Sequence, residues 1–406
     1  MGVGADDTSK DRTVPDYAAP LPIPQLLTSG RFPRTGIPGT GRTAFRRGFA
    51  SGTLGPLRLP IPVLTKALPV AQLPSQTPAR IFEALNAFQR SAALKAAIDL
   101  DLFTHLGRRS ATAEELSQAC GGQLRAVRIL CDYLTVHGFL QKTGTQYQSA
   151  PDAALFLDRN SPAFFGSVTA FLHSSPLTDA FRDITTTVRQ GHTQLPGSGT
   201  VEPNFAGWVD FARSMVPMMR GPAGFLGPLA ARLRPGAVRV LDLAAGHGLF
   251  GIAVAQHNPE ASITALDWAP VLEVARENAL AAGVGERHTL RPGDALQVDL
   301  GGPYELILVT NFLHHFSRET NVHLLQRLAA ALAPGGLILT LEFIPNADRI
   351  SPPMPAEFAL TMLATTAEGD AYTFEEYAGM FEAAGLAQNE MLDVPASTQR
   401  LIISGR

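Results

Sequence analysis

Charged residues and long apolar runs are scarce in this 406-residue chain. Lys and Arg number 33 and Asp and Glu 36, which leaves a formal net charge of −3. A chain so close to neutral lacks the basic excess that broad binding to nucleic acid or to an anionic membrane requires. No apolar stretch approaches the ~20 residues of a membrane span, and the start, MGVGADDTSK, lacks a secretory pattern. We therefore expect neither nucleic acid nor a membrane as partner.

Cysteine is nearly absent as well. The two cysteines, Cys120 and Cys131, lie in one region of helical pattern, and no C-x-x-C pair occurs. A disulfide framework and a zinc site are therefore not supported. The histidines show no metal-ligand spacing, so we expect no catalytic metal. This composition suits a reducing compartment, and we expect a cytoplasmic protein.

Residues 1–76 differ in composition from the rest. Pro, Gly, Ser and Thr are frequent, and no acidic residue occurs from Tyr17 to Phe82. No helical or strand period persists, which predicts a disordered leader. An Arg-rich, acid-poor segment is also typical of a transit peptide, and a start codon placed too early would give the same pattern.

The pattern of residues 77–150 indicates helices followed by a hairpin. Apolar residues recur at helical spacing in three stretches. A capping box at Thr112 begins the second stretch, and Gly138 ends the third. FLQKTGTQYQSA then predicts a hairpin that turns at Thr143 and Gly144. We therefore predict a winged-helix domain.

The third of these helices indicates what kind of partner this domain binds. It carries Arg125 and Arg128, but the rest of it is largely apolar. An apolar helix is typical of burial against a protein partner rather than in a DNA groove. We therefore predict a homodimer that forms through this helical domain.

Residues 151–230 have the pattern of helices and loops, a linker that contributes to a substrate pocket. In NFAGWVDFARSMVPMM, the spacing from Trp208 to Met219 suits one face of a single helix. Ordinary core is the first interpretation of such residues. A flexible Met-rich face also suits a pocket for a flat aromatic ligand. The candidate substrate-binding residues here are Trp208, Phe211, Met215 and Met219.

From residue 231 to 406 short apolar runs alternate with helical stretches. The runs are 238–243, 262–267, 304–309 and 337–344, and the helices between them are roughly 248–257, 270–282 and 319–333. Buried strands separated by helices are typical of a doubly wound parallel sheet. The predicted fold class is α/β, a Rossmann-like domain preceded by the mainly α winged-helix domain.

A glycine turn follows the first of these strands. The strand ends in Asp242-Leu-Ala-Ala-Gly-His-Gly, and Gly246 and Gly248 let a ligand come close to the backbone. The second strand ends in Asp267, whose carboxylate suits both hydroxyls of a ribose, although a helix cap is the alternative. Trp268 comes next and is able to pack on a purine. These features predict a nucleoside-containing ligand.

Two classes of nucleoside ligand fit this turn. Gly246, Gly248 and Gly251 satisfy the G-x-G-x-x-G spacing of dinucleotide-binding proteins. Asp242, however, closes the strand just before them. Its charge disfavours a pyrophosphate and favours the cationic end of S-adenosylmethionine.

Several segments, in order, resemble the motifs of class I S-adenosylmethionine-dependent methyltransferases. VLDLAAGHG resembles their first motif, ALDW their ribose motif, RPGDAL the segment that faces the adenine amine, and LAPGGLIL the entry to their fifth strand. ILCDYLTVHGFL resembles the dimerisation domain of plant caffeate O-methyltransferase-like enzymes and their bacterial small-molecule methyltransferase relatives. The resemblance covers about Thr77 to Arg406 and is specific for cofactor and fold, less so for substrate.

The resemblance implies S-adenosylmethionine as cofactor and a small molecule as substrate. The cofactor-binding residues that we expect are Asp242, Ala244, Gly246, Gly248, Asp267, Trp268, Asp294, Ala295 and Thr310. Where the family usually has glycine this chain has Ala244, whose methyl group crowds the turn slightly.

Two adjacent histidines follow the fourth strand, at the edge where ligands bind in such sheets. If the fourth and fifth strands are neighbours, a histidine here can bond to Glu342, which would orient the ring and raise its basicity. The residues alone do not decide between the two rings. The resemblance places the general base at His314 and leaves His315 to line the substrate site. A second supporting glutamate of the family falls near Ala371, and Asp370 is the candidate replacement.

The predicted reaction is O-methylation of a small, aromatic or secondary-metabolite substrate. N- or C-methylation on the same scaffold is an alternative, as is a non-methylating relative that keeps S-adenosylmethionine as a charge. The pair of His314 and Glu342 favours O-methylation, and the missing second glutamate keeps the alternatives open. The apolar third helix disfavours a nucleoside-sensing DNA-binding regulator.

Overall fold

The computed structural model describes residues 77–203 and 205–406. The predicted leader, 1–76, lies outside the described residues. Within the described residues, no helix has both the length and the hydropathy of a membrane-spanning segment.

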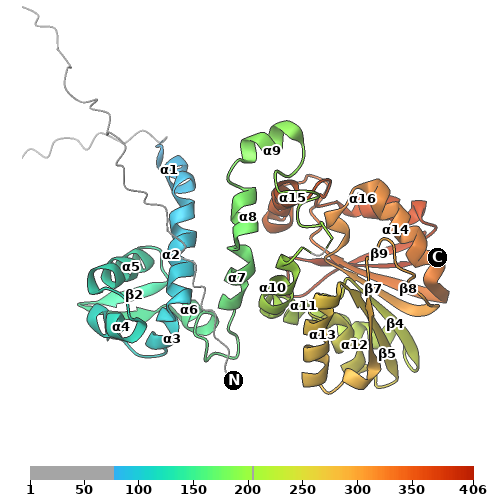
Figure 1. The fold of residues 1–406 in the computed structure, drawn as a ribbon, viewed down its shortest axis with the longest axis horizontal. Coiled ribbons are helices and arrows are strands. Elements are labelled where there is room, and N and C mark those ends of the chain that lie inside the picture. Colours follow the sequence, from blue (N-terminus) through green and yellow to red (C-terminus); the bar gives the residue numbers. More distant parts are fainter. Residues whose placement is uncertain (1–76, 204) are drawn as a thin grey trace, which may run out of the picture. The chain divides into compact units, whose positions relative to one another are not determined.

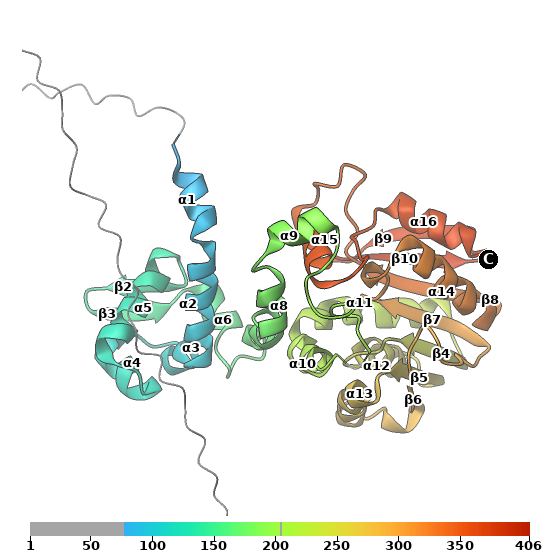
Figure 2. The same ribbon diagram turned by 45° about the horizontal axis from the view of Figure 1, so that its top comes forward.

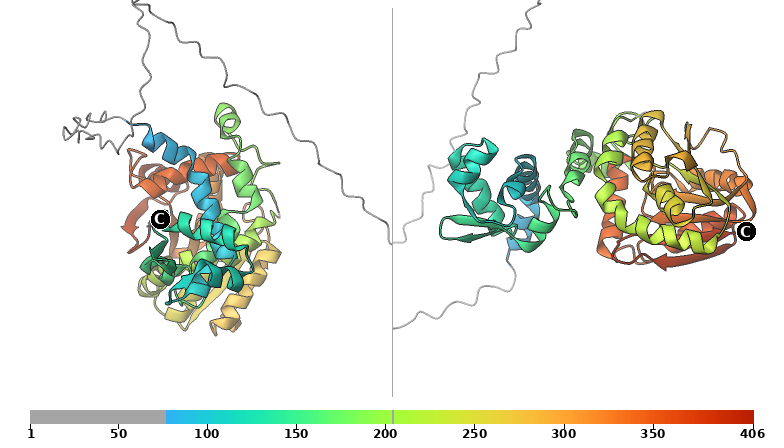
Figure 3. Two further views of the ribbon diagram at one scale, coloured as in Figure 1. Left: turned by 90° about the vertical axis from the view of Figure 1, so that its left-hand side faces the viewer. Right: turned by 90° about the horizontal axis from the view of Figure 1, so that it is seen from below.

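The N-terminal part is built from short helices and a small antiparallel sheet. Its elements are α1 (Ala79–Leu85), α2 (Ala87–Asp99), α3 (Leu102–Leu106), β1 (Ala111–Thr112), α4 (Ala113–Cys120), α5 (Leu124–Val136), β2 (Leu140–Thr143), β3 (Gln146–Ser149) and α6 (Pro151–Phe156). The three strands form one sheet in the order β1-β3-β2, and the hairpin of β2 and β3 is visible in the right-hand view of Figure 3. The predicted winged-helix arrangement is thereby confirmed.

Local sequence explains these boundaries. The side chain of Thr112 accepts a hydrogen bond from the Glu115 N–H, and the Glu115 carboxylate accepts one from the Thr112 N–H, so the predicted capping box begins α4. The predicted first helix is divided into α1, α2 and α3: α1 and α2 meet at Asn86, and Asp101 separates α2 from α3 because it takes the left-handed conformation. Phe103 and Tyr147 are among the side chains that fill the small core beneath.

A stretch of helices joins this part to the large sheet. The elements are η1 (Gly166–Val168), α7 (Thr169–Leu172), α8 (Ser175–Ala180), α9 (Ile184–Gln190), α10 (Gly207–Ser214) and α11 (Val216–Leu233). The single helix predicted from Trp208 to Met219 is wrong, since α10 ends and α11 begins at Met215. Pro217 lies in the first turn of α11, where its missing N–H costs no helical hydrogen bond, so it is suited to begin a new helix there.

The large sheet has seven strands with helices on both faces (Figure 1). Its elements are β4 (Val238–Leu243), α12 (Leu249–His257), β5 (Ala261–Asp267), α13 (Ala269–Ala281), η2 (Gly285–Arg287), β6 (His288–Pro292), β7 (Tyr304–Thr310), η3 (Leu313–His315), α14 (Arg318–Ala331), β8 (Leu332–Glu342), α15 (Pro353–Thr365), α16 (Phe374–Ala383), β9 (Gln388–Asp393) and β10 (Arg400–Gly405). The predicted α/β fold class is confirmed.

The strand order decides where a ligand can bind. The order is β6-β5-β4-β7-β8-β10-β9, with β6 and β9 at opposite edges (Figure 2). Strands β4 to β8 are parallel, while β10 is antiparallel to both neighbours. The chain proceeds outward from β4 in one direction and from β7 in the other. A topological switch point therefore lies between β4 and β7, and their carboxyl ends open a crevice there.

Alternate residues of the strands face two separate cores. Ile307 and Val309 of β7 pack with α14 and α16, whereas Leu306 and Leu308 pack with α11 and α12. Two boundaries differ from the predicted ones: α14 ends at Ala331, and β8 extends from Leu332 to Glu342. The strand begins early because Leu332 already pairs with Tyr304 of β7, across a register shift from the regular ladder that starts at Leu337.

Candidate active site

A cavity of about 370 Å³ opens at the carboxyl ends of the strands, at the switch point. Thirteen of the sixteen predicted site residues line it: Trp208, Phe211, Met215, Met219, Ala244, Gly246, Asp267, Trp268, Asp294, Ala295, Thr310, His314 and His315. The other three, Asp242, Gly248 and Glu342, are not among the lining residues. The cavity thus brings together residues from α10, α11 and four strand ends.

The glycine turn presents main chain to this cavity. Ala244, Gly246 and Gly248 all have positive φ, of 50°, 56° and 74°. Only glycine adopts this conformation without steric cost, so the side chain of Ala244 is accommodated under strain. Gly248 begins α12, and a Cβ there would lie 3.0 Å from the Cβ of Ala275 on α13. Gly248 therefore allows two helices to approach behind the turn rather than contacting a ligand.

Asp267 ties the second strand to the turn. Its Oδ2 accepts a hydrogen bond from the Gly246 N–H at 2.8 Å, and its Oδ1 accepts one from the Trp268 N–H at 2.7 Å. The N-cap of α13 is Trp268, so the alternative that Asp267 caps this helix is not realised. Burial raises the pKa of Asp267 to about 6, although both backbone bonds oppose the rise. The remaining lone pairs of this fixed carboxylate suit two neighbouring hydroxyls.

Asp242 lies behind the turn and is fully buried. Its Oδ2 accepts a hydrogen bond from the Gly251 N–H at 3.0 Å, while its Oδ1 is covered and has no partner among the described residues. Burial raises the pKa of Asp242 to about 7; the Gly251 bond opposes this rise and the charge of Asp267 adds to it. Asp242 therefore fixes the start of α12 behind the turn and does not line the cavity.

His314 and Glu342 form the polar pair that the sequence predicted. His314 lies in η3 just after β7, Glu342 ends the adjacent β8, and Nδ1 of the ring lies 2.5 Å from Oε2 of the carboxylate. The other oxygen of Glu342 accepts backbone N–H bonds from Phe312 and Leu313, each at 2.9 Å. A carboxylate only accepts hydrogen bonds, so Nδ1 carries the proton and Nε2 remains an acceptor. The predicted condition that fourth and fifth strands be neighbours is met by β7 and β8.

Asp370 does not serve as a second carboxylate for this histidine. Its Oδ2 pairs with Arg349 at 3.3 Å and its Oδ1 accepts from the Ala371 N–H at 2.8 Å. Only its backbone reaches the site, where its N–H donates to the His314 carbonyl at 3.0 Å. The ring of Phe358 packs edge-on against His314, with 4.9 Å between centroids. His314 therefore contacts one carboxylate, that of Glu342, and the aromatic ring of Phe358.

The far end of the cavity is aromatic and rich in methionine. Trp208 meets Phe211 and His315 edge-on, at centroid distances of 5.4 and 5.3 Å. Among the described residues that line the cavity there is no Lys, Arg or Glu, and the only aspartates are the two expected beside the nucleoside. This end therefore suits a flat, uncharged molecule.

His315 stays neutral in this setting. Burial, with a smaller contribution from His314, lowers its pKa well below the usual value. Its Nδ1 is covered and has no hydrogen-bond partner among the described residues.

Comparison with known proteins identifies the family. A family model described as an O-methyltransferase domain matches residues 233–387, and a model described as an O-methyltransferase dimerisation domain matches residues 82–159. A solved structure of a candidate O-methyltransferase from Nostoc punctiforme is 44% identical, covers 82% of this chain and 100% of its own, and superposes with a TM-score of 0.80. The chain belongs to the O-methyltransferase family.

Two further proteins, one compared by sequence and one by structure, are similar to this O-methyltransferase. The tetracenomycin polyketide synthesis 8-O-methyl transferase of Streptomyces glaucescens is 28% identical over 76% of this chain and 91% of its own. The structure of human N-acetylserotonin methyltransferase in complex with S-adenosylmethionine shares the fold, with a TM-score of 0.71 at 20% identity over 82% of this chain and 99% of that one. The predicted S-adenosylmethionine-dependent methyltransferase activity and cofactor are confirmed.

The residues present fit that cofactor. Asp267 is a partly buried carboxylate that lines the cavity, and the left-handed turn beside it exposes main chain rather than side chains. Asp294 follows β6 at the same edge, and its Oδ1 accepts the Leu296 N–H at 2.8 Å, which fixes the carboxylate at the cavity wall. Two anchored carboxylates and an open turn match a ribose, an adenine amine and an amino-acid end.

Several residues that line the cavity of this methyltransferase were not predicted from the sequence. His247 does so from the middle of the turn; its Nδ1 accepts the Leu249 N–H at 3.2 Å, and burial lowers its pKa to about 4. His247 lies between two glycines of the turn, and this position could have identified it from the sequence. Phe343, Met354 and Phe358 come from the end of β8 and from α15, where no motif marked them.

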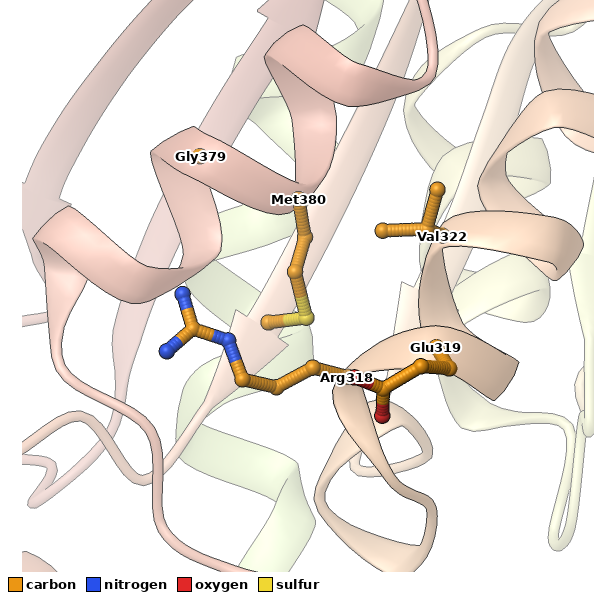
Figure 4. A pocket seen from close by; sticks show the side chains of 5 residues that line it. All are labelled: Arg318, Glu319, Val322, Gly379 and Met380. Carbon is orange, nitrogen blue, oxygen red and sulfur yellow. The ribbon is translucent and has the colours of Figure 1, made fainter.

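A second hollow of about 410 Å³ lies between α14 and α16 (Figure 4). Met380 extends from α16 towards α14, which supplies Arg318, Glu319 and Val322. Arg318 is paired with Glu376 at 3.4 Å. No group of three metal-ligating side chains occurs there or elsewhere in the part of the chain that the structure describes. None of the sixteen predicted site residues is among those that line this second hollow.

Proposed function

We propose that this methyltransferase methylates a ring hydroxyl of a small, flat, uncharged secondary metabolite, with His314 as general base. The observation that carries the proposal is the bond from Nδ1 of His314 to the buried Glu342, at 2.5 Å. That bond leaves Nε2 as an acceptor on a ring that lines the cavity. An imidazole held in this way is placed to take the proton of a bound hydroxyl.

The chain has two tasks in this reaction. S-adenosylmethionine supplies a methyl group that its sulfonium charge has already activated. The protein must align the hydroxyl with that group and remove the hydroxyl proton, which passes to Nε2 of His314. Glu342 stabilises the imidazolium that results, and the apolar walls from Trp208, Met215 and Phe358 exclude water from the reacting atoms.

Cofactor binding is assigned to the opposite end of the cavity. Asp267 would accept the ribose hydroxyls, Trp268 would pack on the purine, and Asp294 with Ala295 would meet the adenine amine. The backbone of Ala244 to Gly246, together with Thr310, would border the amino-acid end. Asp242 and Gly248 would hold the turn in shape from behind.

The names of relatives support an aromatic acceptor. Besides the tetracenomycin enzyme, the curated relatives include a 3-hydroxy-5-methyl-1-naphthoate 3-O-methyltransferase of Streptomyces sahachiroi, 26% identical over 74% of this chain and 86% of its own. Trp208, Phe211, Met215, Met219 and His315 would line the acceptor site. The aromatic and methionine side chains there agree with such a ring.

The enzyme would act as a homodimer. The match to the dimerisation domain supports this, as do four apolar side chains of the N-terminal helices that are more than half exposed: Ile81, Phe82, Leu85 and Phe88. A cytoplasmic location stays a prediction, consistent with two free cysteines.

One relative favours a second candidate reaction. The L-tyrosine C(3)-methyltransferase of Streptomyces lavendulae is 26% identical over 41% of this chain and 47% of its own. Methylation of a ring carbon beside the hydroxyl would use the same base. O-methylation is preferred because the longer matches are to O-methyltransferases.

Product analysis tests the proposal. The enzyme and S-adenosylmethionine would be incubated with hydroxylated polycyclic aromatics and, in parallel, with the corresponding aromatic amines. We expect methyl ethers, identified by NMR of the isolated product. Transfer only to nitrogen or to ring carbon, or no transfer from an enzyme that binds S-adenosylhomocysteine, would contradict it.

A further inference from the structure

Two imidazole rings lie side by side in the cavity and offer opposite hydrogen-bonding groups. The rings of His314 and His315 have centroids 4.3 Å apart, and both line the cavity. On His314 the bond to Glu342 fixes the proton on Nδ1 and leaves Nε2 as acceptor. The proposed function uses this acceptor for the reacting hydroxyl.

His315 presents a donor beside it. Its Nδ1 is covered and without a partner among the described residues. A proton on that nitrogen would be a buried N–H with no acceptor, which proteins avoid more strictly than an unused lone pair. A neutral His315 therefore carries its proton on Nε2. Its edge-on contact with Trp208 holds the ring in this orientation.

We propose that the substrate carries an acceptor oxygen on the ring carbon next to the reacting hydroxyl, and that His315 recognises it. The hydroxyl would donate to Nε2 of His314, and the neighbouring hydroxyl, methoxyl or carbonyl oxygen would accept from Nε2–H of His315. Because the two ring centroids are only 4.3 Å apart, the oxygens that the rings meet must lie close together on the aromatic system. This assignment rests on the proposed function, since it gives the reacting hydroxyl to His314.

The surroundings of the pair support a neutral acceptor group. No Lys or Arg is among the described residues that line the cavity, so a neighbouring carboxylate would lack a counter-charge. Phe312 and Phe316 meet His315 edge-on on its other sides, at 6.5 and 6.2 Å. His315 is therefore a polar side chain, next to His314, that is placed to distinguish positional isomers of one ring.

Calorimetric titration with two isomers tests the inference. The ligands are 2,3-dihydroxynaphthalene, whose oxygens are adjacent, and 2,7-dihydroxynaphthalene, whose oxygens are not. Each is titrated into the enzyme saturated with S-adenosylhomocysteine, so that no turnover occurs. One additional hydrogen bond should make the adjacent isomer bind about three- to tenfold more tightly.

Variants assign the preference to His315. His315→Phe keeps an aromatic ring against Trp208 but has no N–H, and it should bind both isomers alike. His315→Gln restores a donor and should restore part of the preference. Phe312→Leu, which lines the same cavity without a polar group, should weaken both isomers equally. Thermal unfolding midpoints check that each variant is folded.

The outcomes separate this inference from the proposed function. Equal affinities in the wild type, no binding of either isomer, or a preference that survives in His315→Phe would overturn the role of His315. The role of His314 is tested separately by turnover, because His314→Ala should slow methyl transfer by about 10²- to 10⁴-fold yet keep the isomer preference. Full turnover in His314→Ala would refute the general base alone.

Discussion

At the scale of single residues, two strained or buried groups of the cofactor end have measurable consequences. Ala244 holds a left-handed conformation with φ of 50°, and Asp267 is a carboxylate that burial keeps close to protonation. Both features arise because the carboxyl ends of β4 and β5 meet at the glycine turn. Each leads to a prediction.

Ala244→Gly should stabilise the protein. Glycine adopts a positive φ without the clash of a Cβ, so we expect the free energy of unfolding to rise by up to about 1 kcal/mol. Urea denaturation would measure the shift of the midpoint. Ala245→Gly is the matched control, because Ala245 lies outside the left-handed region and should lose stability instead. A loss at both positions would mean that the turn is not strained.

Asp267 should make cofactor binding depend on pH. Its pKa is raised to about 6, so the ionised form that accepts ribose hydroxyls prevails above pH 6 and is lost as pH falls below it. Titration of S-adenosylhomocysteine from pH 8 to 5 should show affinity falling in this window. Asp267→Asn should bind at least about tenfold more weakly and with little pH dependence. A slope that persists unchanged in this variant would belong to Asp242, whose pKa is about 7, and would contradict the assignment.

At the scale of elements, the connection from α15 to α16 packs on the η3 turn that carries His314. The Asp370 N–H donates to the carbonyl of His314, and a Cβ added at Gly369 would lie 2.4 Å from that carbonyl oxygen. The connection therefore packs backbone against backbone on η3. The connection supports His314 through backbone contact, whereas the second carboxylate of the family, which this sequence lacks, would support it through its charge.

Gly369→Ala should slow turnover by displacing His314. We expect a lower kcat with unchanged affinity for S-adenosylhomocysteine, because the substitution is remote from Asp267. Gly379→Ala in α16 serves as control, since no atom lies within 4 Å of its added Cβ. That variant should keep full activity and gain up to about 1 kcal/mol of stability. Equal kcat in both variants would refute the positioning role of the connection.

The N-terminal helices carry an apolar stripe that leads to a prediction about assembly. Ile81, Leu85 and Phe88 recur at helical spacing, and each is more than half exposed. The double variant Phe82→Asp and Phe88→Asp should convert a dimer into a monomer in light scattering at micromolar concentration. Val188→Asp on α9, equally exposed, should leave the dimer intact. A wild type that is already monomeric would contradict the predicted homodimer.

At the scale of the whole molecule, the sequence predicted best what depends on consecutive strand ends. Asp267 and the His314–Glu342 pair were predicted because parallel strands bring their carboxyl ends to one edge. Phe358 and Met354 were missed because α15 reaches the cavity only through tertiary packing. The break at Met215 was missed because the apolar spacing continues through it and outweighed the signal of Pro217. The pairing of Asp370 with Arg349 could not be predicted, because no local pattern shows that these two side chains approach each other.

The account rests on one catalytic group, and one comparison tests it. Methyl transfer from S-adenosylmethionine to a ring hydroxyl would be measured for the wild type and His314→Ala, with S-adenosylhomocysteine titrated into both. The account predicts that kcat of the variant falls by about 10²- to 10⁴-fold, the contribution of general base catalysis, while affinity for the cofactor product is unchanged. Turnover close to wild type in a variant that binds S-adenosylhomocysteine normally would contradict it.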